Sequence, residues 1–171
     1  MKDSHRRWEF ICFDLDGTLA DSLPAMYGAY QAFAGHFGFP PSEEEFRELN
    51  GPSLKQIIGI LKPRHGIREE ETCLFNAYRA EIEKAYRCDV APMNGASAVL
   101  EVLHSRGYTL MLTTSAESGL ALPFIERLNW NRFFMSMVFG NETAKAKPAP
   151  DIYELAIQKA GASPEKVVAV E

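Results

Sequence analysis

The sequence has few cysteines, and their positions form neither a metal motif nor a disulfide motif. The three, Cys12, Cys73 and Cys88, are odd in number and far apart, with no C-x-x-C pair. This usage excludes a disulfide framework and a cysteine zinc site, and it favours a reducing compartment. The sequence also lacks an apolar run near the ~18 residues that span a bilayer, and its charged start does not resemble a signal peptide. We therefore expect a cytoplasmic protein with no membrane partner.

Basic residues are in the minority. Eighteen Lys and Arg stand against 23 Asp and Glu, which gives a formal net charge of −5. A nucleic-acid-binding protein needs a basic stripe, so we expect no nucleic-acid partner. The motifs G-x-x-x-x-G-K-[ST], G-x-G-x-x-G, G-x-S-x-G and H-E-x-x-H are all missing. The 171 residues are enough for one globular domain, or for one domain with a modest insertion.

Four short apolar runs predict the strands of a parallel sheet. An unbroken apolar run is typical of a strand that is covered on both faces. The runs are Phe10 to Phe13, Leu110 to Leu112, Met135 to Phe139 and Val167 to Val170. Helical stripes lie between the later runs, and two of them stop at Gly107 and Gly161, since glycine suits a helix C-terminus. Strands that alternate with helices predict an α/β fold.

The stretch from about Ser22 to Ala91 has a different character and contains no convincing strand. Apolar residues recur in it at helical spacing from Leu23 to Phe37, and again along a long helix that begins near Arg68. Ser42 and Glu45 have the spacing of a capping box, in which each side chain bonds the other residue's backbone amide. We predict an inserted all-helical domain. The domains are an α/β core of residues 1–21 and 92–171 and a helical insertion of residues 22–91.

The segment FDLDGTL places two carboxylates where the first strand ends. Ligands of open α/β sheets bind at the carboxyl ends of the strands. Two carboxylates about 5 Å apart repel by roughly 3 kcal/mol at an effective dielectric near 20, so Asp14 and Asp16 favour a hard cation between them, such as magnesium or calcium. Gly17 allows a sharp turn that exposes amides to an anion. The alternative is an Asx-turn with solvated aspartates.

Three further features follow later strands. Thr114 and Ser115 have hydroxyls suited to an oxyanion, although helix capping is an alternative role. Lys147 lies beside two prolines before a helix, where a solvated surface lysine is the alternative. The last predicted strand ends on the acidic Glu171.

In their order and strand context, these features resemble the haloacid dehalogenase superfamily of phosphohydrolases. The matching segments are FDLDGTLADS, the strand that leads into Thr114 and Ser115, KPAPDIYELA and VVAVE. The resemblance implies a Rossmann-like parallel core with an inserted helical cap. The motif DLDGTLADS, together with Asn50 to Ser53 in the cap, is most similar to the corresponding segments of phosphoglycolate-phosphatase-type hydrolases.

The resemblance implies a role for each matching residue. Asp14 is the nucleophile that forms an aspartyl-phosphate intermediate, and Asp16 is the general acid and then the general base. Thr114 hydrogen-bonds the phosphoryl group, while Lys147 keeps Asp14 ionised and offsets phosphate charge. The expected metal ligands of Mg²⁺ are Asp14, Asp16 (through its backbone carbonyl) and Glu171. The expected substrate-binding residues are Gly17, Thr18, Ser115 and Gly51.

We therefore expect a magnesium-dependent phosphohydrolase that cleaves a small phosphorylated metabolite and is a monomer or a homodimer. One alternative is a sugar-phosphate mutase built on the same core and cap. Another is a non-catalytic phosphate-binding module.

The resemblance implies that the last motif is incomplete in this sequence. Relatives carry an acidic pair in the last motif, followed by a further strand and helix, whereas this sequence stops at the first acidic residue, Glu171. The preceding apolar strand would have an uncovered edge. We expect a C-terminally truncated form with weak or no activity, and a longer form with restored activity.

Overall fold

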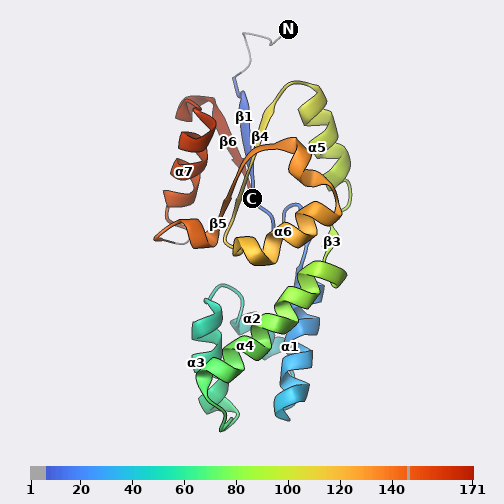
Figure 1. Cartoon of the computed structure of the whole chain (residues 1–171), viewed down its shortest axis with the longest axis vertical. Coiled ribbons are helices and arrows are strands. Elements are labelled where there is room, and N and C mark those ends of the chain that lie inside the picture. The colour runs from blue at the N-terminus through green and yellow to red at the C-terminus, as the bar shows by residue number, and fades with distance from the viewer. Residues whose placement is uncertain (1–6, 146) are drawn as a thin grey trace. The chain divides into compact units, whose positions relative to one another are not determined.

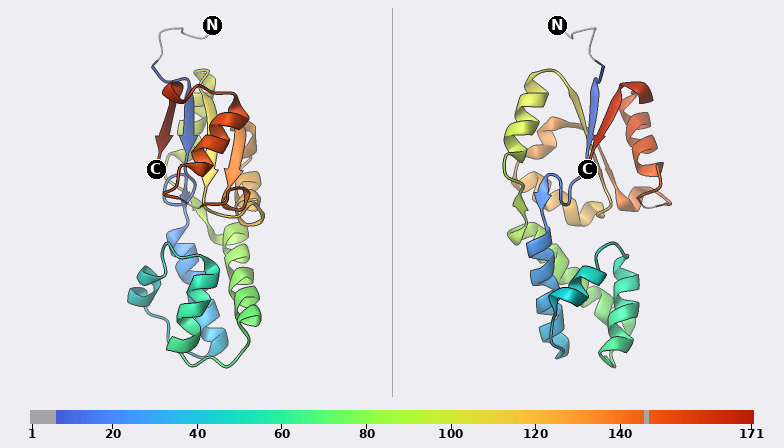
Figure 2. Two further views of the ribbon diagram at one scale, coloured as in Figure 1. Left: turned by 90° about the vertical axis from the view of Figure 1, so that its left-hand side faces the viewer. Right: turned by 180° about the vertical axis from the view of Figure 1, so that it is seen from behind.

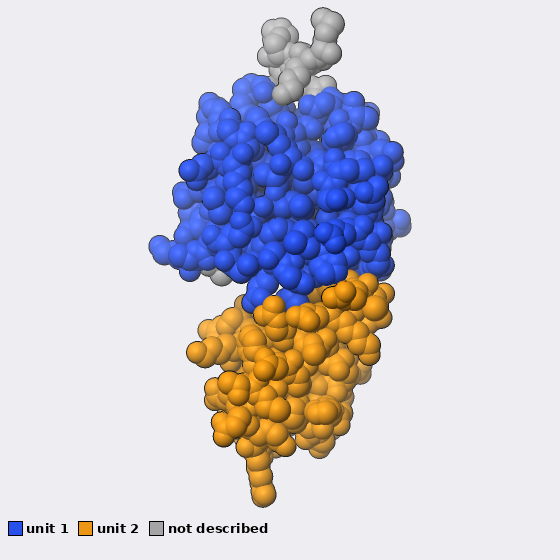
Figure 3. Space-filling model, viewed as in Figure 1, with its two compact units in different colours: residues 1–22, 90–171 blue, residues 23–89 orange. Residues whose placement is uncertain are grey.

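The chain forms two compact units (Figure 3). The computed structural model describes residues 7–145 and 147–171. We call residues 1–22 and 90–171 the core unit, and residues 23–89 the helical unit.

The core unit contains a fully parallel four-stranded sheet in the order β5-β4-β1-β6 (Figure 1). Its strands are β1 (Phe10–Phe13), β4 (Thr109–Thr114), β5 (Phe134–Phe139) and β6 (Val167–Val170). The central strand β1 has neighbours on both sides, since Phe13 pairs with Leu112 of β4 and with Val170 of β6. The four predicted strands and the α/β class are confirmed.

Helices cover both faces of this sheet (Figures 1 and 2). Helix α7 (Asp151–Ala160) lies on one face, where Ile152 and Ala156 pack against the buried side chains of Cys12, Met111 and Val138. Helices α5 (Ala96–Ser105) and α6 (Ser118–Arg127) lie on the other face. Short 3₁₀ turns complete the unit, namely η2 (Trp130–Phe133), η3 (Gly140–Glu142) and η4 (Pro164–Lys166).

The predicted ends of two helices are confirmed. Gly107 follows α5 and Gly161 follows α7, with φ angles of 80° and 59°. These left-handed values suit glycine, which has no Cβ to clash with the following carbonyl. Helix α6 was not predicted; Pro123 lies within it.

A short antiparallel pair lies where the chain leaves and re-enters the core unit. Strand β2 (Ala20–Asp21) pairs with β3 (Ala91–Pro92). Strand β2 lies before the stretch from about Ser22 to Ala91 in which we predict no strand, and β3 overlaps that stretch only at its last residue, Ala91. Two-residue strands are too short to show an alternating pattern.

The three cysteines are free thiols, and only Cys12 is buried. Burial raises the pKa of the Cys12 thiol to about 11, so it is protonated at neutral pH. No helix in residues 7–145 and 147–171 is both long enough and apolar enough to cross a membrane.

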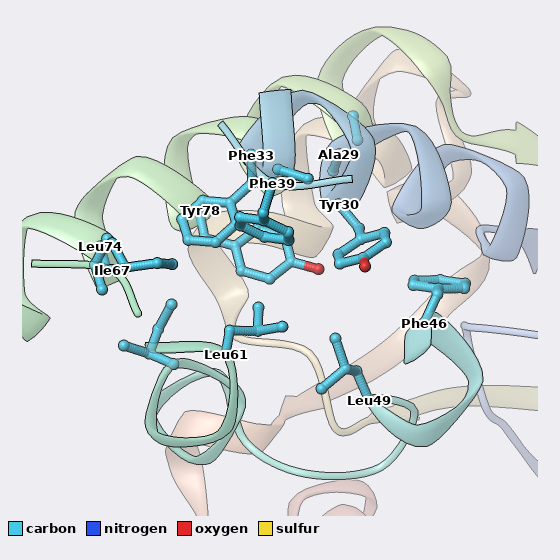
Figure 4. Close-up of a cluster of buried hydrophobic side chains, with 13 residues drawn as sticks. Ala29, Tyr30, Phe33, Phe39, Phe46, Leu49, Leu61, Ile67, Leu74 and Tyr78 are labelled. Carbon is cyan, nitrogen blue, oxygen red and sulfur yellow. The ribbon is translucent and has the colours of Figure 1, made fainter. Parts of the chain in front are cut away.

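The helical unit has its own apolar core, rich in aromatic rings (Figure 4). Its elements are α1 (Leu23–Phe37), α2 (Glu43–Glu48), α3 (Leu54–Arg64), α4 (Glu71–Lys84) and a π-helical turn η1 (Ala85–Asp89). Phe33 of α1 stacks on Tyr78 of α4, with ring centroids 4.7 Å apart and an interplanar angle of 18°. These contacts between separate helices hold the unit together independently of the sheet.

A buried carboxylate links three helices of this unit. Glu45 of α2 accepts hydrogen bonds from Tyr30 of α1 and from Arg64 of α3, and His65 Nε2 lies 2.8 Å from Glu45 Oε1. Burial favours the neutral acid, but the hydrogen bonds outweigh it and lower the pKa of Glu45. Burial and the bond to Glu45 raise the pKa of Tyr30 to about 12.

The capping box predicted for Ser42 and Glu45 is present in only one of its two hydrogen bonds. The Ser42 hydroxyl does accept from the Glu45 amide, at 3.1 Å, but the Ser42 amide donates to the Tyr30 hydroxyl rather than to Glu45. The predicted reciprocal capping box at Ser42 is therefore wrong, because the Glu45 side chain is drawn into the core. A reciprocal box occurs instead at the start of α3, between Ser53 and Gln56.

Candidate active site

The parallel sheet brings the predicted site residues of the core unit to one edge. Asp14 follows β1, Thr114 ends β4 and Glu171 follows β6. The register fixes this, because Phe13 pairs with both Leu112 and Val170. The Asp14 amide also donates to the carbonyl of Val170, at 2.9 Å. This edge is the carboxyl end of the strands, where α/β sheets bind ligands.

Lys147 connects two of these residues. Its Nζ lies 2.8 Å from Asp14 Oδ1 and 2.7 Å from Glu171 Oε1, and it donates to the Thr113 carbonyl at 3.2 Å. An ammonium group has three donors, so all three have acceptors here. The Lys147 and Asp14 side chains are only 14% and 16% exposed. The alternative of a solvated surface lysine is therefore wrong.

The charges in this group stabilise one another. Burial alone would lower the pKa of Lys147, but hydrogen bonds to Asp14 and Glu171 outweigh it and the pKa is raised. Burial likewise favours the neutral form of Glu171, and the bonds from Lys147 and Tyr153 outweigh it, so the pKa of Glu171 is lowered. At neutral pH Lys147 is therefore a full cation, and Glu171, which it contacts, is ionised.

Tyr153 is a neighbour of this group that the sequence reasoning missed. It lies in the first turn of α7, its hydroxyl donates to Glu171 Oε1, and Lys147 Nζ lies 5.2 Å from its ring centroid. Such a cation above an aromatic face is attracted by the ring. The available signal was the aromatic residue six positions after Lys147 in KPAPDIYELA.

The loop after β1 is closed by its own backbone. The Leu15 carbonyl accepts from the amides of Thr18, Leu19 and Ala20, and Gly17 turns the chain with a φ of 83°. The predicted sharp turn at Gly17 is therefore present. The amides of Gly17 and Thr18 are not available to an anion, however, since the Gly17 amide donates to the Ala20 carbonyl at 2.9 Å. Asp16 is half-buried in this loop.

Thr114 and Ser115 differ in their surroundings. Thr114 is fully buried, and its Oγ1 accepts from the Ala116 amide at 3.1 Å. The capping alternative is wrong for Thr114, because α6 begins at Ser118 with Glu117 at its N-cap, and this N-cap residue makes no side-chain cap bond. A hydroxyl that accepts one bond still has its own hydrogen to donate, so the oxyanion role is open to Thr114. Ser115 is exposed. The remaining predicted residue, Gly51, is in the helical unit between α2 and α3 with a φ of 111°, and its contact with substrate stays a prediction.

The carboxylates fit a hard cation in their donor chemistry. Asp14 and Glu171 bond Lys147 through Oδ1 and Oε1, and within the described residues Oδ2 and Oε2 accept no hydrogen bond. Magnesium is usually held by one or two carboxylates together with several waters. In the same part of the chain, no three His, Cys, Asp or Glu side chains are grouped closely enough to form a metal site alone. The Mg²⁺ assignment thus stays a prediction.

The fold and the site together define an α/β enzyme with an acidic centre at the carboxyl edge of its sheet. Residues 11–171 match the family model described as haloacid dehalogenase-like hydrolase, so the chain belongs to that family. The predicted family and the predicted hydrolase class are confirmed.

Several relatives carry the name phosphatase. The phosphorylated carbohydrates phosphatase of Thermotoga maritima is 30% identical over 163 residues, which are 95% of this chain and 76% of that protein. Phosphoglycolate phosphatase 1 of Pseudomonas aeruginosa is 29% identical, over 94% of this chain and 61% of its own length. Among solved structures, a Thermotoga maritima protein provisionally assigned as a beta-phosphoglucomutase has a TM-score of 0.82 and 30% identity. That match covers 94% of this chain and 74% of the other.

Proposed function

We propose that this chain is a magnesium-dependent phosphohydrolase that cleaves a small phosphomonoester through an aspartyl-phosphate intermediate. The observation that carries the proposal is the contact of Lys147 with Asp14 at the carboxyl edge of the sheet, at 2.8 Å and largely shielded from solvent. A carboxylate held ionised beside a cation is a competent nucleophile toward phosphorus.

The hydrogen bonds select the attacking atom. Because Asp14 Oδ1 accepts from Lys147, Oδ2 is the oxygen that forms the new bond to phosphorus. The bond from phosphorus to the ester oxygen breaks, and Asp16 gives its proton to the departing alkoxide. A water then loses a proton to Asp16 and attacks phosphorus, which releases inorganic phosphate and regenerates the Asp14 carboxylate.

The surrounding residues offset the charge of the transferring group. Lys147 is ionised and faces Asp14, so its positive charge balances the phosphoryl oxygens as they approach. Thr114 has a hydroxyl hydrogen to donate to one of those oxygens, and Ser115, the Thr18 hydroxyl and Gly51 are proposed substrate contacts. Gly17 turns the loop, and its amide already donates to the Ala20 carbonyl. The carboxylates of Asp14 and Glu171, with the Asp16 carbonyl, would hold Mg²⁺, which supplies further charge neutralisation at a phosphoryl group.

The proposed substrate class is a small phosphorylated metabolite. Relatives are named for phosphorylated carbohydrates, 6-phosphogluconate and phosphoglycolate, and these compounds share a phosphomonoester on a short polar carbon chain. We also propose a cytoplasmic location, which rests on the cysteine usage in the sequence.

Asp14→Asn tests the nucleophile. Asparagine keeps an oxygen that accepts from Lys147 but cannot form the acyl phosphate, so we expect the phosphate release of the wild-type chain to be lost. The measurement is inorganic phosphate released from a panel of sugar phosphates and phosphoglycolate with Mg²⁺. The matched control is Asp21→Asn, an exposed aspartate on β2, which should keep wild-type turnover. Near-normal turnover by Asp14→Asn would refute the assignment.

A mutase is the second candidate, because the structural match with 30% identity is provisionally assigned as a beta-phosphoglucomutase. In that case the product retains its phosphate and a sugar bisphosphate is needed for turnover. Phosphorus-31 NMR of the reaction distinguishes the two, since only a phosphatase produces a rising signal of inorganic phosphate.

A further inference from the structure

The 3₁₀ turn after β5 is bonded to the loop that contains the predicted oxyanion-binding residues. The Gly140 amide donates to the Ala116 carbonyl at 3.0 Å. Asn141 bonds Ser118 twice: Oδ1 accepts from the Ser118 amide at 3.0 Å, and Nδ2 donates to Ser118 Oγ at 3.3 Å. Since Ser118 is the first residue of α6, Asn141 satisfies a helix amide that would otherwise lack a partner.

Gly140 lies against the backbone of Ser115. A Cβ added at Gly140 would be 2.1 Å from the Ser115 carbonyl oxygen and 2.8 Å from the carbonyl carbon, while real Cβ contacts do not fall below 3.0 Å. The φ of Gly140 is outside the left-handed region. The need for glycine here therefore comes from the close approach alone and not from the backbone conformation.

The other end of the turn is anchored to α7. Glu142 Oε1 accepts from the Phe139 amide at 3.0 Å, and the same carboxylate pairs with Lys159. Burial favours the neutral form of Glu142, but the bonds from Lys159 and Phe139 outweigh it and lower its pKa. The turn is thus fixed on one side to α7 and on the other side to the loop after β4.

We infer that the turn Gly140–Glu142 is a positioning element for the segment Thr114–Ala116, and that Gly140 is its central residue. The inference rests on the proposed function, in which Thr114 binds the phosphoryl group. A Cβ at Gly140 must push the Ser115 carbonyl by about 1 Å, and a misplacement of that size in a reacting site costs about 100-fold in rate.

The test compares Gly140→Ala, Asn141→Ala and a control, Gly59→Ala, in the full chain. Gly59 lies within α3, and a Cβ there meets nothing within 4 Å, so this variant should behave as wild type. For Gly140→Ala we expect a roughly 100-fold lower kcat/KM, a higher Kd for inorganic phosphate by calorimetry, and shifted amide NMR signals at Ser115 and Ala116. For Asn141→Ala we expect the same changes, about tenfold in kcat/KM.

The outcomes separate positioning from simple packing. A folded Gly140→Ala chain with wild-type kcat/KM and phosphate Kd would overturn the inference, even if its melting temperature fell. If Gly140→Ala does not fold, the test rests on Asn141→Ala. Wild-type kcat/KM and phosphate Kd for Asn141→Ala would then overturn the inference. If the wild-type chain binds phosphate but does not turn over, the proposed function fails, and the phosphate Kd of the variants still tests the positioning role. A wild-type chain that neither turns over nor binds phosphate overturns both.

Discussion

Lys147→Met removes the ammonium group that contacts both Asp14 and Glu171 while keeping a side chain of similar length. In the variant, the two carboxylates face each other without a cation. At a separation of roughly 5 Å and an effective dielectric near 20, their repulsion is about 3 kcal/mol. Removing one partner of a fully buried ion pair costs about 3–5 kcal/mol.

The expected loss of stability lies below that range. Lys147 and Asp14 keep 14% and 16% exposure, and the Glu171 side chain is 54% exposed, so solvent screens part of the repulsion. We expect Lys147→Met to lower the free energy of unfolding by about 2–3 kcal/mol at pH 7.

The loss should depend on pH in a defined direction. The pKa of Glu171 is lowered from 4.5, so its contribution is present above that value and is lost as the pH falls through the folded-state pKa. The pKa of Lys147 is raised from 10.5, so its contribution is present below that value and is lost as the pH rises through the folded-state pKa. The difference between wild type and Lys147→Met should therefore be greatest between about pH 5 and pH 10 and should decline on both sides.

Urea unfolding followed by tryptophan fluorescence measures this difference in the core unit, because both tryptophans, Trp8 and Trp130, are in that unit. The control is Lys166→Met. Its pair with Glu9 is 3.2 Å long and the two side chains are 36% and 38% exposed, so we expect a loss of at most about 0.5 kcal/mol. A loss for Lys147→Met as small as the control at pH 7, or one undiminished at pH 3, would refute the reasoning.

Two further predictions concern the helical unit and are measured by urea unfolding with circular dichroism at 222 nm. Glu45→Gln replaces a carboxylate with 8% side-chain exposure that accepts from Tyr30 and Arg64, and should cost about 1.5–3 kcal/mol at pH 7. Because the pKa of Glu45 is lowered from 4.5, this difference should decline below that pH and vanish as the pH falls through the folded-state value; a difference as large at pH 3 as at pH 7 contradicts the assignment. Phe33→Ala removes a ring that is 1% exposed and stacked on Tyr78, and should cost about 3–5 kcal/mol; a loss below 1 kcal/mol would show that the cluster does not stabilise the unit.

The parts of the fold that the sequence predicts correctly are those with local signals. The run Phe10 to Phe13 is short, unbroken and followed by Asp14, which is sufficient to identify a buried strand and its functional end. Gly161 marks the end of α7 for a similarly local reason, since it follows the last apolar position of the helical stripe. The family resemblance then identified Lys147, whose contact with Asp14 spans 133 positions.

The features that escaped prediction depend on contacts between distant segments. Glu45 fits a capping box by its spacing, but the core of the helical unit offers it Tyr30 and Arg64 as partners from other helices. Gly140 has an ordinary backbone conformation, so only the approach of Ser115 reveals why it is glycine. Tyr153 has the spacing of any aromatic residue on a helix, and its bond to Glu171 arises from the position of β6 beside β1.

The order of strands in the sheet has a consequence for synthesis on the ribosome. Strand β1 is made first, but its neighbours pair with it through Thr109 and Val167, about a hundred residues or more later. At about 5–20 residues per second, β1 waits roughly 5–20 s for its first partner, while the uninterrupted segment 23–89 is already complete. During that interval the strand exposes only four residues of unpaired backbone. Asp14 and Asp16 end that run with negative charge and oppose its pairing with other nascent chains, so the residues proposed for catalysis also protect the chain while it folds.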